Sequence, residues 1–377
     1  MNNPRIAWLL TSAFYYWHPM LSELAKRVPH MTAFAANWRG YAPGFEDSFT
    51  VDVVGNRKVI PLLKSQTSYG SNFTFLPLNI VGRLLKFKPQ VVFSNSFGMW
   101  TLLALLLKPL GRWQVVIAYE GSSPGVDYRN SPVRLWMRRI MVHLADACIT
   151  NSQAGRDYLI KLLKAKEDVV FVQPYEVPAV NALVNAEAGA VPEPEHRPCF
   201  LFVGSIKPRK GVHLFLKSCA QLVEQGCKDY TVWMIGDGEQ RAELENFCTE
   251  NNLNDQVKWI GQVDYNQLGN YFQQADVFVL PTLEDTWGMV ILEAMVLGKP
   301  ILCSCWAGAS ELIQDGQNGY CFDPHHPGEL AEKMQKIITE PDLVHKMGNQ
   351  SITVMSQYTP GAAADFLVNV ADFAMAE

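Results

Sequence analysis

Residues 283–300, LEDTWGMVILEAMVLGKP, place one carboxylate inside an otherwise apolar segment. Between 289 and 297 every residue except Glu293 is aliphatic, Met or Ala. This composition, followed by Gly298 and Pro300, predicts a short buried helix that ends at the glycine. A buried polar group without a partner costs roughly 2–7 kcal/mol. We therefore expect Glu293 to hold a partner, either hydroxyls of a ligand such as ribose or a nearby lysine or backbone amide.

A second acidic position precedes this helix. Asp285 lies eight residues before Glu293, in the turn EDTWG. Its carboxylate could bind sugar hydroxyls, or it could cap the helix, a position that suits both Asp285 and Thr286. The first turn of the helix, near Met289, would present unsatisfied N–H groups and the positive end of the helix dipole. A phosphate is the natural ligand of such a helix end.

A basic loop follows another predicted strand, in VGSIKPRKGVHLFL (203–216). The strand ends at Gly204, and Lys207, Arg209 and Lys210 follow before a helix begins. Three cations within four residues at the carboxyl end of a strand suit a pyrophosphate. The alternative is a solvated basic loop.

The elements that must position these residues alternate between strand and helix. Strands are predicted at 5–10, 31–36, 91–96, 114–120 and 147–152, and again at 199–205, 231–238, 257–263, 276–282 and 300–305. Helical patterns fill the gaps, which predicts α/β architecture: two Rossmann-like, doubly wound parallel-sheet domains. The expected boundaries are a first domain over 1–178, a proline-containing linker over 179–197, a second domain over 198–356, and a C-terminal helix over 357–377 that packs back on the first domain. Ligands of such sheets bind beyond the carboxyl ends of the strands, so a cleft between facing domains is expected.

The charge distribution is asymmetric. Residues 1–180 carry 20 Lys and Arg against 11 Asp and Glu, whereas residues 181–377 carry 12 against 26. A basic first half indicates an anionic partner, and without a recognisable nucleic-acid module we expect an anionic membrane surface or lipid. No apolar run reaches the ~18–20 residues that cross a bilayer. The eight cysteines form no CxxC pair, and no signal-peptide cleavage site follows the first strand. We therefore expect a cytoplasmic protein, peripheral at the inner face of a membrane.

Several segments in order carry a family resemblance: VGSIKPRKG, IGDGEQRAEL, WIGQV, ADVFVLPT, DTWGMVILEAM, GKPILCS and GASELIQDGQNGYCF. In this order, residues 198–325 resemble the donor-binding half of the family-4 retaining glycosyltransferases (group 1 type) of GT-B fold. The segments ADACITNSQAGRDYL and VQPYEVP resemble the last strand and helix of the first domain and its crossing. The first 90 residues match poorly.

The resemblance implies roles for individual residues on the donor side. Glu293 would bind the nucleotide ribose, and Asp285, where the family has Glu, would contact hydroxyls of the donor sugar. Lys210 would bind the pyrophosphate. The family's second cation, an arginine, is replaced by Ser205, so Lys207 or Arg209 would supply it. Further donor contacts are implied for Gly204, Gly261, Gly288, Met289, Val290 and Ile291, the last four through backbone N–H groups.

The acceptor side is less well defined. TSAFYYWHP (11–19) stands where the family often has a Gly-Gly loop. Tyr16 and Trp17 could stack on an acceptor sugar, although such residues more often belong to a core. His18 could act in catalysis or serve in capping and packing. Glu120 stands where relatives often place a His or Asp near the acceptor, with a surface carboxylate as the alternative.

The predicted function is transfer of a sugar from a nucleotide sugar to a hydroxyl of a glycan or lipid-linked glycan, as in polysaccharide biosynthesis. The resemblance implies retention at the anomeric carbon, with Lys210, Arg209, Asp285 and Glu120 as catalytic residues. No cofactor and no metal are expected, because the chain contains no Asp-x-Asp. Alternatives are a nucleotide-sugar 2-epimerase and a non-catalytic nucleotide-sugar-binding subunit. A dinucleotide-dependent dehydrogenase would need the glycine fingerprint that is absent here.

Overall fold

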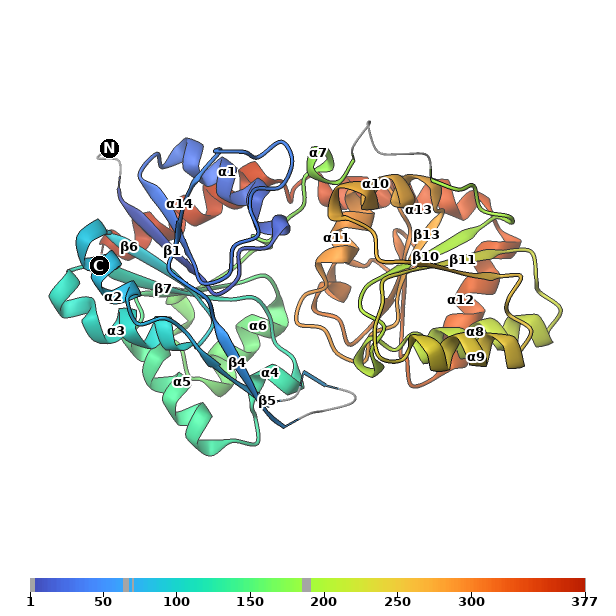
Figure 1. Cartoon of the computed structure of the whole chain (residues 1–377), viewed down its shortest axis with the longest axis horizontal. Helices are drawn as coiled ribbons and strands as arrows, with labels where there is room; N and C mark the ends of the chain where they lie inside the picture. The colour runs from blue at the N-terminus through green and yellow to red at the C-terminus, as the bar shows by residue number, and fades with distance from the viewer. Residues whose placement is uncertain (1–3, 64–67, 70, 185–190, 377) are drawn as a thin grey trace. The chain divides into compact units, whose positions relative to one another are not determined.

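The structure, a computed structural model, describes residues 4–63, 68–69, 71–184 and 191–376 (Figure 1). Contacts divide the chain into two compact units. The first contains the described residues of 1–64, 70–177 and 358–377, and the second those of 65–69 and 178–357.

The first unit is built on a seven-stranded parallel sheet with strand order β3-β2-β1-β6-β7-β8-β9. Its strands are β1 (Ile6–Leu10), β2 (Met31–Ala35), β3 (Thr50–Val53), β6 (Val91–Asn95), β7 (Gln114–Tyr119), β8 (Ala147–Thr150) and β9 (Val170–Val172). β4 (Lys58–Leu63) and β5 (Ser71–Phe75) form a separate antiparallel pair. The central strands are continuously apolar because helices cover both faces of the sheet.

The helices of the first unit are α1 (His18–Arg27), α2 (Ile80–Phe87), α3 (Met99–Gly111), α4 (Pro124–Asp127), α5 (Pro132–Leu144), α6 (Gln153–Asp157) and α14 (Pro360–Ala376). Shorter turns are η1 (Tyr15–Trp17), η2 (Tyr158–Leu162) and η3 (Glu167–Val169). The C-terminal α14 packs against α1, β6 and β7. Arg27 Nε donates to Asp365 Oδ1 at 2.5 Å across the α1–α14 contact.

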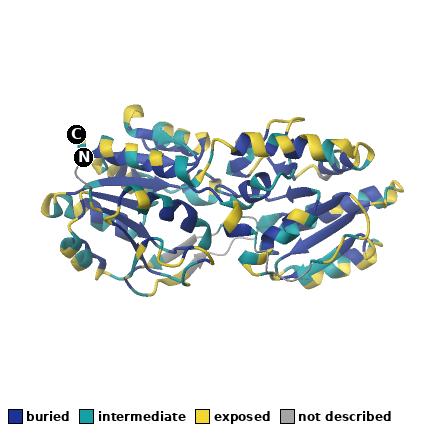
Figure 2. Cartoon of the chain, turned by 90° about the horizontal axis from the view of Figure 1, so that it is seen from above, coloured by how far each residue is buried: buried dark blue, intermediate teal, exposed yellow. Residues whose placement is uncertain are grey.

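The second unit has a six-stranded parallel sheet in the order β12-β11-β10-β13-β14-β15. Its strands are β10 (Cys199–Val203), β11 (Thr231–Ile235), β12 (Val257–Gly261), β13 (Val277–Leu280), β14 (Ile301–Ser304) and β15 (Gly319–Phe322). Its helices are α7 (Val180–Leu183), α8 (Val212–Glu224), α9 (Arg241–Glu250), α10 (Tyr265–Gln274), α11 (Met289–Val296), α12 (Pro327–Thr339) and α13 (Asp342–Met355), with the short turns η4 (Pro208–Lys210) and η5 (Gly308–Leu312). The sheets are buried, and the outer faces of the helices carry the exposed residues (Figure 2).

The predicted pair of doubly wound parallel sheets is confirmed, and all ten predicted strands are present. The strands that the sequence missed are β3, β9 and β15 at sheet edges and the pair β4–β5. Edge strands are short and carry little of the continuous apolar pattern that marks a central strand. In both sheets the strand order reverses beside the first strand, at β1–β6 and at β10–β13. Ligands bind at this switch point in open α/β sheets.

The predicted linker over 179–197 contains α7, which packs against α10 of the second unit. A Cβ at Gly269 of α10 would lie 2.2 Å from the Leu183 carbonyl oxygen, so the glycine permits this close approach. Residues 185–190 of the predicted linker lie outside the described residues.

The short helix around Glu293 is present as α11 and ends as predicted. Gly298 takes a left-handed φ of +72°. Its N–H donates to Met295 O, and the Lys299 N–H donates to Ala294 O, both at 3.0 Å. These two bonds are the pair that closes a helix at a C′ glycine, and they satisfy carbonyls that α11 leaves open.

We predict that Gly211→Ala destabilises the second unit more than Gly226→Ala. Both glycines have positive φ, +67° and +82°, so both variants incur left-handed strain of about 1–2 kcal/mol. A Cβ at Gly211 would also lie 2.0 Å from Pro281 O, whereas one at Gly226 meets nothing within 4 Å. Calorimetric unfolding of both variants measures the difference. Equal midpoints would contradict the close approach of the two loops.

Candidate functional site

Two loops of the second unit meet at the point where its strand order reverses. One follows β10 and contains η4, and the other runs from β13 to α11. The Arg209 carbonyl oxygen accepts from Leu283 N at 2.8 Å and from Thr282 Oγ1 at 3.1 Å. In return, the Arg209 guanidinium donates to the Glu284 carbonyl oxygen. The basic loop is therefore fixed against the acidic loop rather than solvated on its own.

Lys210 and Asp285 form an ion pair between these loops. Lys210 Nζ lies 2.5 Å from Asp285 Oδ2, and both side chains are largely buried. Burial raises the pKa of Asp285, but the charge and hydrogen bond of Lys210, with a further contribution from Arg209, lower the pKa below its usual value overall. Asp285 does not cap α11, whose N-cap residue is Gly288 and has no side-chain cap. It is therefore an ionised carboxylate held beside two cations.

Tyr69 completes this cluster within the second unit, and the sequence analysis did not identify it. Its hydroxyl donates to Asp285 Oδ1 at 3.2 Å and accepts from the Thr286 N–H at 3.3 Å. The Arg209 guanidinium stacks on its ring, 3.9 Å from the centroid. A tyrosine hydroxyl therefore bonds the carboxylate that the resemblance assigns to sugar hydroxyls. No periodic pattern near residue 69 could have signalled this contact.

Glu293 lies in the second turn of α11 and is 5% exposed. Tyr265 Oη, from α10, donates to its Oε1 at 3.0 Å. Burial raises the pKa of Glu293 to about 7, although the Tyr265 hydrogen bond lowers it in part. The observed partner is thus a phenol, neither the lysine nor the backbone amide that the sequence offered as structural alternatives. Near neutral pH this carboxyl is poised between its neutral and ionised forms.

The remaining donor-side candidates surround the same strand ends. Gly288 has a φ of +95° and begins α11, and the Ile291 N–H already donates to the Gly288 carbonyl at 2.9 Å. Gly204 closely approaches Gly236, while Gly261 is the last residue of β12 and has a φ of +87°. Lys207 is exposed, and Met289 and Val290 form the first turn of α11.

The acceptor-side candidates of the first unit lie partly in its core. His18 is fully buried among aromatic rings, and its Nδ1 accepts from the Ala42 N–H at 2.9 Å. Burial lowers the pKa of His18 to about 4, so the imidazole is neutral. Trp17 is also buried, against Trp8, while Tyr16 is half-buried. The hydrogen bond of His18 is the packing arrangement that the sequence offered as an alternative.

Glu120 follows β7 and belongs to a polar group at the carboxyl ends of the strands. The Asn151 side chain donates to the Glu120 carbonyl at 3.0 Å, and Asn151 Oδ1 accepts from Tyr175 N at 2.9 Å. Glu176 is buried, and its Oε1 has no hydrogen-bond partner among the described residues. Burial raises the pKa of Glu176 well above its usual range, and the charge of Glu120 adds to this. Polar residues directly after β8 and β9 were the available sequence signal for this group.

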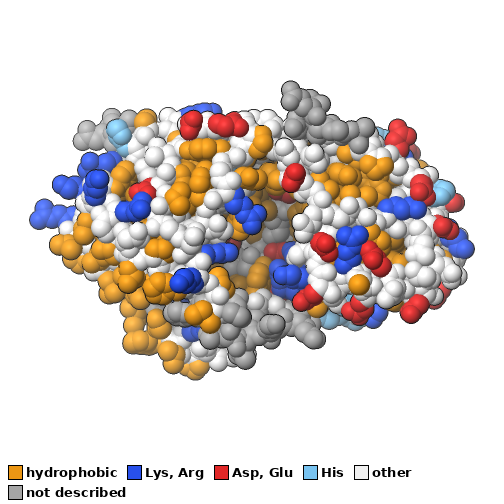
Figure 3. Space-filling model, in the orientation of Figure 1, with side chains coloured by type: hydrophobic (Ala, Val, Ile, Leu, Met, Phe, Trp, Pro, Cys, Tyr) orange, Lys and Arg blue, Asp and Glu red, His pale blue; other side chains and the backbone are white. Residues whose placement is uncertain are grey.

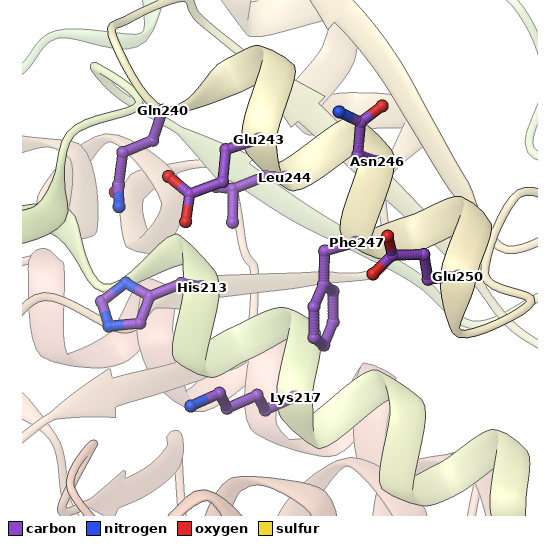
Figure 4. Close-up of a pocket in the computed structure, with 8 residues that line it drawn as sticks. All are labelled: His213, Lys217, Gln240, Glu243, Leu244, Asn246, Phe247 and Glu250. Carbon is purple, nitrogen blue, oxygen red and sulfur yellow. The ribbon is translucent and has the colours of Figure 1, made fainter.

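A cavity of about 460 Å³ opens between α8 and α9 (Figure 4). It is lined by His213, Lys217, Gln240, Glu243, Leu244, Asn246, Phe247 and Glu250. None of the predicted donor or acceptor residues lines this cavity, so it is separate from the Lys210–Asp285 cluster. Over the described parts of the chain, no group of three or more His, Cys, Asp or Glu side chains could hold a metal ion.

Two doubly wound parallel sheets, each with a switch point, are the architecture of the GT-B fold. Solved structures support the fold over the whole chain. The Anabaena protein HepE, solved in complex with UDP, matches with a TM-score of 0.73 over 98% of this chain and 99% of that one, at 17% identity. A glycosyltransferase from Rickettsia africae also matches with a TM-score of 0.73, at 14% identity, over 99% of both chains.

Family models match both units. Residues 184–354 match the family described as glycosyl transferases group 1, and residues 15–174 match glycosyltransferase family 4. The chain belongs to the group 1, family-4 glycosyltransferases.

Curated relatives match over part of their length. The α-D-kanosaminyltransferase of Streptomyces kanamyceticus is 26% identical over 63% of both chains. A D-inositol 3-phosphate glycosyltransferase of Paenarthrobacter aurescens is 28% identical over 54% of this chain and 52% of its own. The matched stretches thus span about half to just under two thirds of these two relatives.

We predict a pH dependence of stability that originates at Glu293. Because its pKa is raised from 4.5 to about 7, the folded state holds a proton that the unfolded state releases between these values. The free energy of unfolding therefore falls as pH rises through this window, by about 3 kcal/mol at most. Glu293→Gln has no carboxyl group to titrate and does not lose this stability. The difference in unfolding midpoint between the variant and the natural chain therefore shifts in favour of the variant from pH 5 to pH 8. Parallel profiles would contradict the prediction.

Proposed function

We propose that this chain transfers a glycosyl unit from a nucleoside diphosphate sugar to an acceptor hydroxyl, with retention at the anomeric carbon and without a metal ion. The observation that carries the proposal is the buried Lys210–Asp285 pair at the switch point of the second unit, beside Arg209. Such a pair offers a cation to a diphosphate and a carboxylate to sugar hydroxyls within one small volume.

The donor would bind across the carboxyl ends of β10 and β13. Lys210 and Arg209 would hold the diphosphate, together with the N-terminal end of α11, whose dipole and N–H groups favour an anion. Asp285 would accept hydrogen bonds from the sugar, in place of its present bond from Tyr69. Glu293 would accept from the ribose diol. HepE has been solved with UDP and with UDP-glucose, so UDP is the first nucleotide to test.

The proposed reaction breaks the bond between the anomeric carbon and the phosphate oxygen, and forms one to the acceptor oxygen on the same face. The acceptor proton passes to the departing diphosphate. The negative charge that develops on the diphosphate is stabilised by Lys210 and Arg209, which is preorganised electrostatic catalysis. Glu120 and its neighbours at the strand ends of the first unit are the proposed acceptor side. The nature of the acceptor, a glycan or lipid-linked glycan, is part of the proposal.

We expect UDP to raise the thermal midpoint of the natural chain and not that of Glu293→Ala. A ligand at 100 times its Kd stabilises by about 2.7 kcal/mol, which shifts the midpoint by several degrees. Tyr265→Phe is the matched control, because it removes the phenol that bonds Glu293 but keeps the carboxylate. GDP, ADP and NAD are measured in parallel. A shift by UDP that survives in Glu293→Ala would refute the ribose contact. A shift by a nucleotide sugar that is transferred to no acceptor would favour a non-catalytic nucleotide-sugar-binding subunit.

We expect Lys210→Ala to lower kcat roughly 100-fold, the loss typical when one group that stabilises developing charge is removed. Lys210→Arg keeps the cation and should restore part of the rate. Lys217→Ala is the control, because Lys217 is an exposed residue of α8 that lines the separate cavity between α8 and α9. Product is measured in EDTA with a UDP-sugar and acceptor panel, and its anomeric configuration by NMR. Full activity of Lys210→Ala would refute the role of Lys210, and loss of activity in EDTA would refute the metal-independent reaction. An inverted product would refute retention. An epimerised sugar formed without acceptor would refute the transfer itself.

A further inference from the structure

The helix α5 in the first unit is packed with its apolar side outward. Val133, Trp136, Met137, Ile140 and Leu144 are all exposed, and Trp136 is 63% exposed. Their spacing of three or four residues places them on one face of the helix. An ordinary surface helix buries such a face against the core. The composition of α5 alone therefore gives no reason for this orientation.

The opposite face of α5 is anchored by a buried arginine. Arg138 NH1 donates to Tyr158 Oη at 2.7 Å and to the Asp127 carbonyl at 3.3 Å. Its guanidinium also lies 4.8 Å from the centre of the Phe97 ring. Met141 and Val142 are buried on the same side. These contacts fix the rotation of α5 about its own axis. The exposure of its apolar face therefore follows from the packing of the helix.

The neighbouring helix α3 extends the same surface. Lys108 of α3 donates to the Leu144 carbonyl at the end of α5, and Leu106 and Leu110 are exposed. Among the described residues, seven of the fifteen exposed large apolar side chains lie on these two helices. Figure 3 shows hydrophobic side chains gathered in the region where Figure 1 places α3 and α5, with Lys and Arg side chains at its edge.

The charge around this surface is mainly positive, although Asp146, two residues after the end of α5, pairs with Lys108 of α3. Residues 80–144, from α2 to the end of α5, contain nine Lys or Arg and two acidic residues. Neither acid lies on α2, α3 or α5; Asp127 is fully buried and Glu120 follows β7. Arg112, Arg139, Lys86 and Lys88 are exposed. The net charge of this segment is therefore +7, against +9 for residues 1–180 as a whole, so most of the net positive charge of the basic half lies here.

We propose that the exposed face of α3 and α5 docks on a lipid bilayer with anionic headgroups. A bilayer accepts an apolar helix face with an interfacial tryptophan, while its negative surface attracts the flanking cations. A second copy of this chain would bring two positively charged surfaces together, which disfavours self-association. The docking proposal is independent of the proposed transfer reaction, and it specifies which surface of the first unit meets the membrane.

The test is flotation of the full chain with vesicles of phosphatidylcholine, with and without phosphatidylglycerol. We expect flotation with the anionic vesicles that weakens with added salt. Trp136→Gln combined with Ile140→Gln should lower the partition coefficient about tenfold or more, because two apolar side chains no longer enter the interface. Ile352→Gln, on α13 of the second unit, removes a comparably exposed side chain and should leave flotation unchanged.

Three results would overturn the proposal: no flotation with either vesicle, equal flotation of the double variant, or a dimer in sedimentation velocity that the double variant abolishes. The last would make a second copy the occupant of the surface. Unfolding of the double variant at the natural midpoint shows that its fold is intact. The nucleotide-induced shift of the midpoint, measured on the same samples, separates a failure of docking from a failure of the proposed transfer.

Discussion

The close tie between the loops after β10 and β13 is the constraint on which the second unit's site depends. These strands are neighbours at the reversal of strand order, so their carboxyl ends open side by side. Hydrogen bonds to the Arg209 carbonyl from Leu283 N and Thr282 Oγ1 then bring Lys210 to Asp285 across 75 residues of sequence. Gly211 is required here because its missing side chain leaves room for the Pro281 carbonyl. The Lys210–Asp285 ion pair thus depends on the packing of the two loop backbones as well as on the opposite charges of the side chains.

Asp285 and Glu293 are both buried, but their different partners give their carboxyl groups different properties. Asp285 is held as a carboxylate because cations lie within contact distance, and Glu293 is held partly neutral because its one observed partner is a phenol. An incoming ligand with hydroxyl groups would compete with Tyr69 at Asp285 and with Tyr265 at Glu293. Tyrosine hydroxyls can satisfy these carboxyls in the absence of such a ligand, which limits the cost of keeping them buried.

In the first unit, too, the partners of a buried polar side chain determine a property of the site around it. Its buried Arg138 is accommodated by hydrogen bonds and aromatic faces, and this accommodation determines which side of α5 meets solvent. Because Arg138 occupies the inner face of α5, the apolar side chains of the helix lie on its outer face. His18 and Trp17 show the converse, since both were candidates for the acceptor side and both are buried in the core.

The sequence by itself determined the two doubly wound domains, because central parallel strands are continuously apolar and their turns carry Gly, Pro and charge at regular intervals. It also determined the end of α11 at Gly298, since only local backbone geometry is involved there. Tertiary structure decided the partners: Tyr69 for Asp285, Tyr265 for Glu293, and the core for His18. It also decided that the apolar face of α5 points to solvent. The sequence shows that α5 has an apolar face, but not whether that face is buried or exposed. Partner choice depends on contacts between residues far apart in the chain, and periodicity carries no information about them.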